Sequence, residues 1–180
     1  MKILKSQDEI KCLADLCWQT REVIGEIAEI GVYEGGSLAI IREFANGKII
    51  HGFDTFEGFI EEQILEGEAY KKGELKSDYG KIYKEFERFD NIKLHKGDIL
   101  QTMKEVEDRQ FSFIHLDIDI YKPTKECLEF FYPRLSQGGI VLIDDYCPTN
   151  WGVIKAVNEF IAEHNLELKR GVSRLAYIKK

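Results

Sequence analysis

The sequence predicts an α/β fold: a seven-stranded, mostly parallel sheet with helices on both faces and an antiparallel last strand. Three observations support this. Short apolar segments alternate with amphipathic helical segments along most of the chain. The apolar segments are nearly continuous, as in strands that are buried on both faces. The last two apolar segments follow each other across a turn at Gly171, as in an antiparallel pair.

The N-terminal part is expected to form two helix–strand units. Ser6 and Glu9 have the spacing of a capping box, so a helix should begin just after Ser6. The Asn46-Gly47 pair is a turn signal between the next helix and strand. The predicted elements are a helix to about 19, a strand at 26–30, a helix at 37–44 and a strand at 48–53.

The C-terminal part continues the alternation. Pro123 suits the first turn of a helix that should run to about Leu135 and end at Gly138-Gly139. The remaining predicted elements are strands at 92–94, 111–117, 140–143, 166–169 and 175–178, with helices at 99–106 and 151–164. Residues 57–90 differ, because they are rich in charge and glycine. Helical pieces at 60–72 and 78–88 are plausible there, as a lid over a site or as a solvated insertion.

Composition limits the class of protein. A length of 180 residues is typical of one domain, here 1–180, with 57–90 as a candidate lid insertion. Lys+Arg is 25 and Asp+Glu is 32, so the net charge is 25 − 32 = −7, which disfavours a nucleic-acid partner. No apolar run approaches the ~20 residues of a membrane helix, so we expect no membrane partner and a cytoplasmic location. The four cysteines show no metal-binding spacing.

Carboxylates stand at the end of each of the first five predicted strands. Parallel α/β sheets bind ligands beyond the carboxyl ends of their strands, so these side chains should face one cavity. Like charges that converge need cations, bound hydroxyls or raised pKa values to be tolerated. The residues are Glu29, Asp54, Asp98, Asp117, Asp119, Asp144 and Asp145.

The glycine turn after the first strand predicts a nucleotide-type cofactor. Tyr33 stands where an NAD site needs glycine, and Ser37 stands where a P-loop needs lysine. S-adenosylmethionine has no phosphate and is positively charged at its sulfonium, so it suits acidic surroundings. Asp54 follows Gly31 by 54 − 31 = 23 residues, close to the ~20 expected for a carboxylate on a ribose. The candidate donor contacts are Glu29, Gly31, Tyr33, Gly35, Ser37, Asp54 and Asp98.

A second group of carboxylates suggests a metal. Asp117, Asp144 and Asp145 follow neighbouring strands and could hold Mg²⁺, which prefers oxygen ligands. Such an ion would position an acceptor hydroxyl and lower its pKa, and Asp117 or Asp119 could take the proton. Instead of binding a metal, the three aspartates could form a solvated acidic rim. Instead of acting as a base, Asp119 could cap a helix. His115 fits a core histidine or a catalytic base.

Four segments resemble the macrocin O-methyltransferase (TylF/MycF) family. They are Glu29-Ile-Gly-Val-Tyr-Glu-Gly-Gly-Ser37, Gly52-Phe-Asp-Thr-Phe-Glu-Gly58, Asp117-Ile-Asp-Ile-Tyr-Lys-Pro-Thr124, and Tyr132 to Gly139 with Ile143-Asp-Asp-Tyr146. The resemblance implies a Rossmann-like class I methyltransferase that uses S-adenosylmethionine and Mg²⁺. It implies metal ligands at Asp117, Asp144 and Asp145, and donor contacts at Glu29, Gly31, Ser37 and Asp54.

The expected function is therefore Mg²⁺-assisted O-methyl transfer to a small-molecule hydroxyl, for which the resemblance implies a sugar. Three alternatives stay open: a metal-independent methyltransferase of another small-molecule class, a non-catalytic module that binds S-adenosylmethionine, and an NAD-dependent enzyme. Oligomeric state is also open, with a homodimer as one option.

Overall fold

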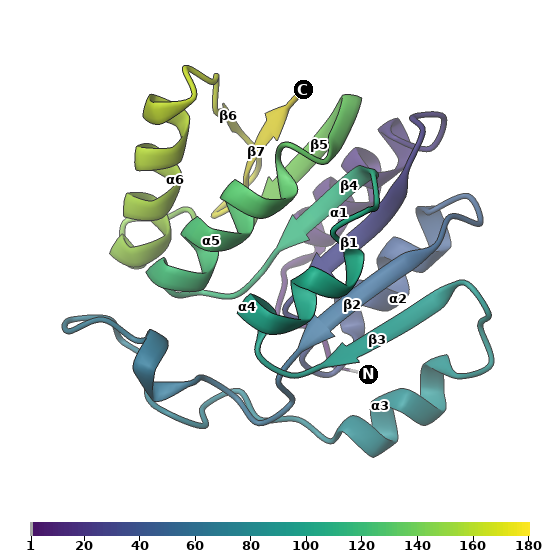
Figure 1. Cartoon of the computed structure of the whole chain (residues 1–180), viewed down its shortest axis with the longest axis horizontal. Helices are drawn as coiled ribbons and strands as arrows, with labels where there is room; N and C mark the ends of the chain where they lie inside the picture. The colour runs from purple at the N-terminus through teal and green to yellow at the C-terminus, as the bar shows by residue number, and fades with distance from the viewer. Residues whose placement is uncertain (1) are drawn as a thin grey trace.

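The computed structural model describes residues 2–180 and contains one seven-stranded sheet in the order β3-β2-β1-β4-β5-β7-β6 (Figure 1). Its strands are β1 Glu26–Ile30, β2 Ile50–Asp54, β3 Ile92–Lys96, β4 Phe111–Leu116, β5 Leu135–Ile143, β6 Lys169–Arg170 and β7 Ala176–Lys179. The first five strands pair in parallel, whereas β7 is antiparallel to both β5 and β6. The predicted fold class is thus confirmed.

The order of strands reverses between β1 and β4. From β1 the chain moves outward to β2 and β3, and it then returns to the other side of β1 to form β4 and β5. Crossover connections therefore leave opposite faces of the sheet at this point, so the loops diverge and leave a crevice beyond the carboxyl ends of β1 and β4. The topology alone puts the candidate site there.

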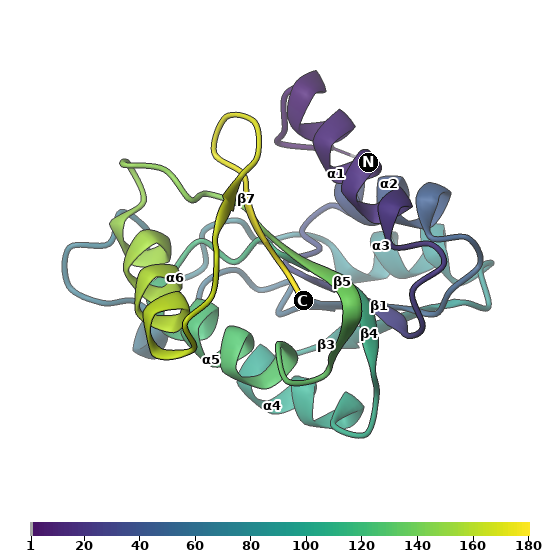
Figure 2. The same cartoon turned by 90° about the horizontal axis from the view of Figure 1, so that it is seen from above.

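The helices form a layer on each face of the sheet (Figure 2). One layer contains α1 Gln7–Gln19, α2 Gly36–Phe44 and α3 Tyr79–Phe86, and the other contains α4 Ile99–Thr102, α5 Tyr121–Phe131 and α6 Trp151–Glu163. Each layer buries its own apolar cluster against the sheet. Because both faces are covered, the central strands are apolar almost throughout, and β4 is buried along its whole length.

Helix α1 forms where the capping pattern predicts it. The Ser6 side chain accepts a hydrogen bond from the Glu9 backbone N–H, and the Glu9 carboxylate accepts one from the Ser6 N–H. These bonds satisfy two of the donors that a helix N-terminus leaves free. Leu13 and Cys17, four residues apart, then face α2 and the sheet from one side of the helix.

Three predictions about elements need correction. The strand expected at 166–169 is only the two-residue β6, Lys169–Arg170. The helix expected to run from Pro123 to Leu135 spans Tyr121–Phe131 instead, and Gly138-Gly139 lies inside β5 rather than at a helix end. Gly138 has a φ of +84°, and the register of β5 against β4 shifts in this region, so the glycine pair marks an irregularity in the strand. Residues 60–72 contain only the short 3₁₀ helix η1 Glu61–Gln63, because this segment spreads over the site instead of packing on a core.

Residues 2–180 contain no helix that is both long enough and apolar enough to cross a bilayer.

Gly31, directly after β1, leaves no room for a side chain. Its φ is +97°, and a Cβ atom there would lie 1.8 Å from the carbonyl oxygen of Asp117 at the end of β4. The missing side chain therefore lets the carboxyl ends of β1 and β4 approach each other closely.

We expect Gly31→Ala to lower the free energy of unfolding by about 3 kcal/mol or more, because a backbone clash adds to the strain of a positive φ. Gly47→Ala is the matched control, with a φ of +75° and no atom within 4 Å of the added Cβ. It should cost about 1 kcal/mol. Urea denaturation of both variants measures the difference, and equal losses would show that close approach at Gly31 is unimportant.

Candidate functional site

A cavity of about 270 Å³ opens beyond the carboxyl ends of the central strands. Its walls come from residues 2–5 and from the segments that follow the carboxyl ends of β1 to β5, including the long segment between β2 and α3. Arg174, in the loop before β7, also lines it. Backbone hydrogen bonds continue past the strand ends, from Gly31 N–H to Phe53 O at 2.9 Å and from Asp117 N–H to Ile30 O at 2.8 Å. The carboxyl ends of these strands are therefore aligned at one edge of the sheet, and the residues that follow them lie close together.

The glycine turn is attached to the end of β2 by one carboxylate. Asp54 accepts hydrogen bonds from the backbone N–H groups of Tyr33 at 2.7 Å and Phe56 at 2.6 Å. Burial raises the pKa of Asp54 despite these hydrogen bonds, which favour the charged form. The carboxylate both lines the cavity and holds the turn in place. Each oxygen keeps a second lone pair for a ligand.

The structure brings most of the predicted donor contacts to this cavity. Gly31, Tyr33, Ser37, Asp54 and Asp98 are in its wall. Asp98 also caps α4 through the N–H of Leu100.

Glu29 and Gly35 are placed elsewhere, outside the cavity wall. The Glu29 side chain is fully buried, and its Oε1 lies 3.1 Å from Nδ1 of His115, the residue paired with it in register on β4. Gly35 is the N-cap of α2 and has a φ of +78°. Glu29 therefore supports the strand ends from within the sheet in this structure.

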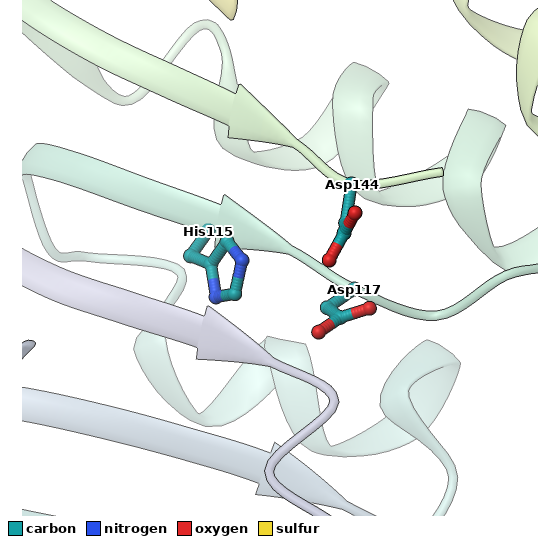
Figure 3. Close-up of side chains that lie close together, drawn as sticks. All are labelled: His115, Asp117 and Asp144. Carbon is teal, nitrogen blue, oxygen red and sulfur yellow. The ribbon is translucent and has the colours of Figure 1, made fainter. Parts of the chain in front are cut away.

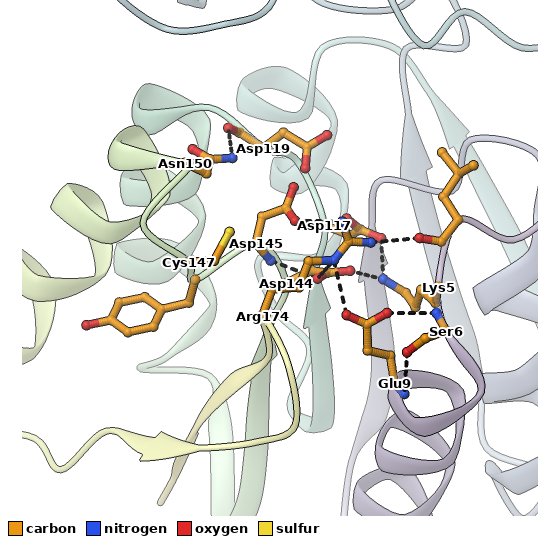
Figure 4. A network of polar contacts seen from close by, with 12 residues as sticks. Lys5, Ser6, Glu9, Asp117, Asp119, Asp144, Asp145, Cys147, Asn150 and Arg174 are labelled. Carbon is orange, nitrogen blue, oxygen red and sulfur yellow. Dashed lines mark hydrogen bonds and ion pairs between the residues drawn. The ribbon is translucent and has the colours of Figure 1, made fainter.

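Two of the three predicted metal ligands, Asp117 and Asp144, contact the same lysine, whereas Asp145 does not. Asp117 Oδ2 accepts a hydrogen bond from Lys5 Nζ at 2.8 Å, and Asp144 Oδ2 bonds to the same Nζ (Figure 4). His115 lies next to this pair (Figure 3), with a ring nitrogen and one oxygen of each aspartate all within 4.8 Å of one another. Two carboxylates thus face one positive charge, as they would in a site where both bind the same cation.

Arg174 provides the second positive charge. It lies in the loop before β7, with Nε 3.2 Å from Asp144 Oδ1 and Nη1 3.2 Å from Asp145 Oδ1 (Figure 4). Its Nε is also 3.3 Å from Glu9 Oε1, on α1. Asp145 therefore joins the cluster through Arg174, whereas Asp117 and Asp144 join it through Lys5.

Asp117 and Asp119 have opposite electrostatic environments. Burial disfavours the charged form of Asp117, but the nearby charges of Lys5, His115 and Arg174 outweigh it and hold its pKa below the usual value. Burial raises the pKa of Asp119 well above its usual value, and a hydrogen bond to Asp145 and the charge of Asp117 add to this. Nearby, the Asn150 side-chain amide donates to the Asp119 carbonyl at 2.8 Å.

Backbone strain is concentrated at the strand ends. Tyr33 after β1, Asp119 after β4 and Asp145 after β5 have φ values of +49°, +60° and +56°, and all three line the cavity. This left-handed conformation is unfavourable for residues other than glycine, least so for aspartate. Strain of this kind tends to lie at ligand sites, where the surrounding structure enforces it.

The segment between β2 and α3 covers one side of the cavity. Phe59, Ile60, Gln63 and Tyr70 are in the wall, and the rings of Phe59 and Tyr70 have centroids 4.6 Å apart. The far end of the segment contacts the helices beyond the site. The Glu68 carboxylate accepts a hydrogen bond from the Tyr121 N–H at 2.6 Å, and Trp151 Nε1 donates to the Gly67 carbonyl at 2.9 Å.

Several site residues escaped the sequence analysis. Gln63 donates to the Asp98 carboxylate at 2.8 Å, and Tyr70 lies near Asn150. Lys5 and Arg174 lie close to opposite ends of the sequence and belong to no motif. The only usable signal was the acidic cluster itself, which requires positive charge without indicating its source.

The chain matches the family model of the macrocin O-methyltransferases (TylF) over residues 8–172. It belongs to this family. Among curated TylF-like relatives, it is 26% identical over 162 residues to a mycinamicin III 3''-O-methyltransferase from Micromonospora griseorubida, covering 80% of this chain and 63% of that protein. It is 31% identical over 140 residues to a 4'-O-methyltransferase of a rhamnosyl tetracenomycin C from Streptomyces olivaceus. This match covers 69% of this chain and 54% of that protein.

A solved structure agrees with this family assignment. The calicheamicin methyltransferase CalS11 superimposes with a TM-score of 0.78 at 26% identity, covering 95% of this chain and 78% of that one. The chain spans between 54% and 64% of the length of the curated relatives it matches. Those relatives therefore contain segments with no counterpart in this TylF-family chain.

We expect Asp54→Asn to lower the free energy of unfolding by about 1–3 kcal/mol, because an amide can accept only one of the two backbone hydrogen bonds and places its NH₂ against the other donor. The exposed Asp90 provides the control variant Asp90→Asn. Urea denaturation compares the two. A loss no larger than that of the control would contradict the role of Asp54 in holding the glycine turn.

Proposed function

We propose that this protein is an S-adenosylmethionine-dependent O-methyltransferase that acts on a hydroxyl of a sugar or a sugar-containing metabolite. The observation that carries the proposal is one cavity with two kinds of wall: a glycine turn held by Asp54, and an acidic cluster of Asp117, Asp119 and Asp145. Family membership supports methyl transfer, and the name of one relative specifies a substrate that carries a rhamnosyl group.

The first wall suits the methyl donor. The turn after β1 and the start of α2 offer backbone N–H groups to a carboxylate, and Ser37 adds a hydroxyl. Asp54 and Asp98 lie on the β2 and β3 side of the same cavity, where their free lone pairs can accept hydrogen bonds from a ribose and an adenine. The negative charge of the opposite wall favours a sulfonium.

The second wall fits a divalent cation, with Lys5 as the stand-in charge between Asp117 and Asp144. Asp117, Asp144 and Asp145 would hold Mg²⁺, which supplies a Lewis acid for the acceptor hydroxyl. These aspartates also fix the direction from which an acceptor approaches, because they stand at the ends of neighbouring strands that are held level by backbone hydrogen bonds.

Asp119 is the base in this proposal. Asp117 is engaged by Lys5, whereas among residues 2–180 no lysine or arginine pairs with Asp119. In the reaction, the acceptor oxygen attacks the methyl carbon in line, the carbon–sulfur bond breaks, and the hydroxyl proton passes to the Asp119 carboxylate. The sulfur leaves as a neutral thioether. Positioning of the two reactants supplies much of the rate.

We expect the protein to transfer labelled methyl groups from S-adenosylmethionine to at least one acceptor in a panel of deoxysugar glycosides, and to lose this activity in EDTA and regain it with Mg²⁺. Equal rates with and without EDTA would remove the metal from the mechanism. Tight donor binding by calorimetry without turnover on any acceptor would instead favour a binding module.

Asp119→Asn should lower kcat by about 10²- to 10⁴-fold, because an amide cannot take the proton. The affinity for S-adenosylmethionine, measured by calorimetry, should stay within about two-fold. Asp90→Asn, on the exposed surface, is again the control. A kcat for Asp119→Asn close to that of the control would assign proton removal to another group.

The engagement of Asp117 and Asp144 by Lys5 also supports one alternative, a methyltransferase in which lysine replaces the metal. The EDTA experiment decides between the two.

A further inference from the structure

Lys5 is positioned as a fixed part of the acidic site. Its side chain is only 3% exposed, although lysine normally keeps its ammonium in water. The backbone on both sides of Lys5 is held. The Leu4 carbonyl accepts a hydrogen bond from Arg174 Nη2 at 2.7 Å, and Ser6 caps α1 (Figure 4).

The segment that carries Lys5 also lies against the donor side of the cavity. A Cβ on Gly36, at the start of α2, would be 2.4 Å from the Lys2 carbonyl oxygen and 2.7 Å from Ile3 Cβ. Residues 2–5 all belong to the cavity wall. The segment that carries Lys5 is therefore packed between the start of α2 and the cavity.

A divalent cation that binds Asp144 would meet a buried carboxylate that Lys5 and Arg174 already neutralise. The Asp144 side chain is 1% exposed and bonds to Lys5 through Oδ2, while its Oδ1 lies near Arg174. Both oxygens of this carboxylate thus face a positive group. A divalent ion that used Asp117 and Asp144 together would occupy the space of the ammonium and repel it.

We propose that Lys5 is an intramolecular competitor for the divalent cation, so that the cation binds Asp117 and Asp144 only when the ammonium leaves them. The inference rests on the cation site of the proposed function, and it adds a residue that sets the affinity of that site.

The experiment measures Mn²⁺ binding without any turnover. Electron paramagnetic resonance counts free Mn²⁺ in solutions of the wild type, Lys5→Gln and Lys11→Gln. Lys11 is the control, because its side chain is 75% exposed and pairs with Asp15 away from the site. Circular dichroism checks that each variant is folded.

We expect Lys5→Gln to bind Mn²⁺ at least about ten-fold more tightly than the wild type. If the ammonium occupies the site about nine-tenths of the time, only about one-tenth of the wild-type protein can bind the ion, and removal of the ammonium raises the affinity about ten-fold. Lys11→Gln should match the wild type. Addition of Asp144→Asn to Lys5→Gln should remove the gain. Equal affinities of Lys5→Gln and the wild type, or no binding by either, would overturn the inference.

A second measurement uses the wild type alone and so does not depend on the folding of a variant. Acetylation of lysines followed by peptide mass spectrometry should show that Lys5 reacts slowly and that Mg²⁺ accelerates its reaction, while Lys11 is unaffected. No acceleration at Mg²⁺ concentrations where Mn²⁺ competition shows binding would overturn the proposal. Both results are separable from the proposed function, because neither requires an acceptor or a methyl donor.

Discussion

Electrostatic repulsion among carboxylates at the sheet edge is the constraint on which the rest of the structure depends. Asp117 follows β4, and Asp144 and Asp145 follow the neighbouring strand β5. Asp119 lies two residues after Asp117. In a partly buried place such a cluster is tolerated with positive charge among its members or with raised pKa values, and the raised pKa of Asp119 is an example of the second. Lys5 and Arg174 supply this charge from near the two ends of the sequence. The acidic site therefore also connects the N-terminal segment and the loop before β7 to the core.

The same edge depends on close approach of the backbone. Gly31 lets the end of β1 lie against the end of β4, and Asp54 ties the turn that follows β1 to β2. Three cavity residues at the strand ends have the left-handed backbone conformation, which residues other than glycine rarely adopt. The cavity is thus shaped mainly by rigid strand ends, and rigid elements hold reacting groups more accurately than loops do.

The segment between β2 and α3 completes the cavity in a different way. It has little regular structure, yet its tip is attached to α5 through Glu68 and to α6 through Trp151. A wall made of a loop on a rigid scaffold is where enzymes usually vary their specificity. The cavity is thus bounded by strand ends on one side and by this loop on the other.

The sequence by itself determined the sheet, its strands and the edge at which the carboxylates meet. Apolar runs and the capping box are local signals, and the rule that ligands bind at the carboxyl ends of parallel strands needs no coordinates. The same signals misplaced Gly138-Gly139, because a glycine pair ends a helix and bends a strand equally well. They also predicted a donor contact at Glu29, which stays a prediction; the structure shows only that this side chain is buried next to His115.

Only the tertiary structure decided how the charges are paired. Lys5 is separated from Asp117 by 112 positions and from Asp144 by 139, and Gln63 reaches Asp98 from the short 3₁₀ helix η1, 35 positions earlier in the chain. Contacts of this kind leave no periodic trace in the sequence, because each depends on where two distant segments come to lie. The sequence could therefore show that positive charge was needed at the sheet edge, and the fold alone showed which residues bring it.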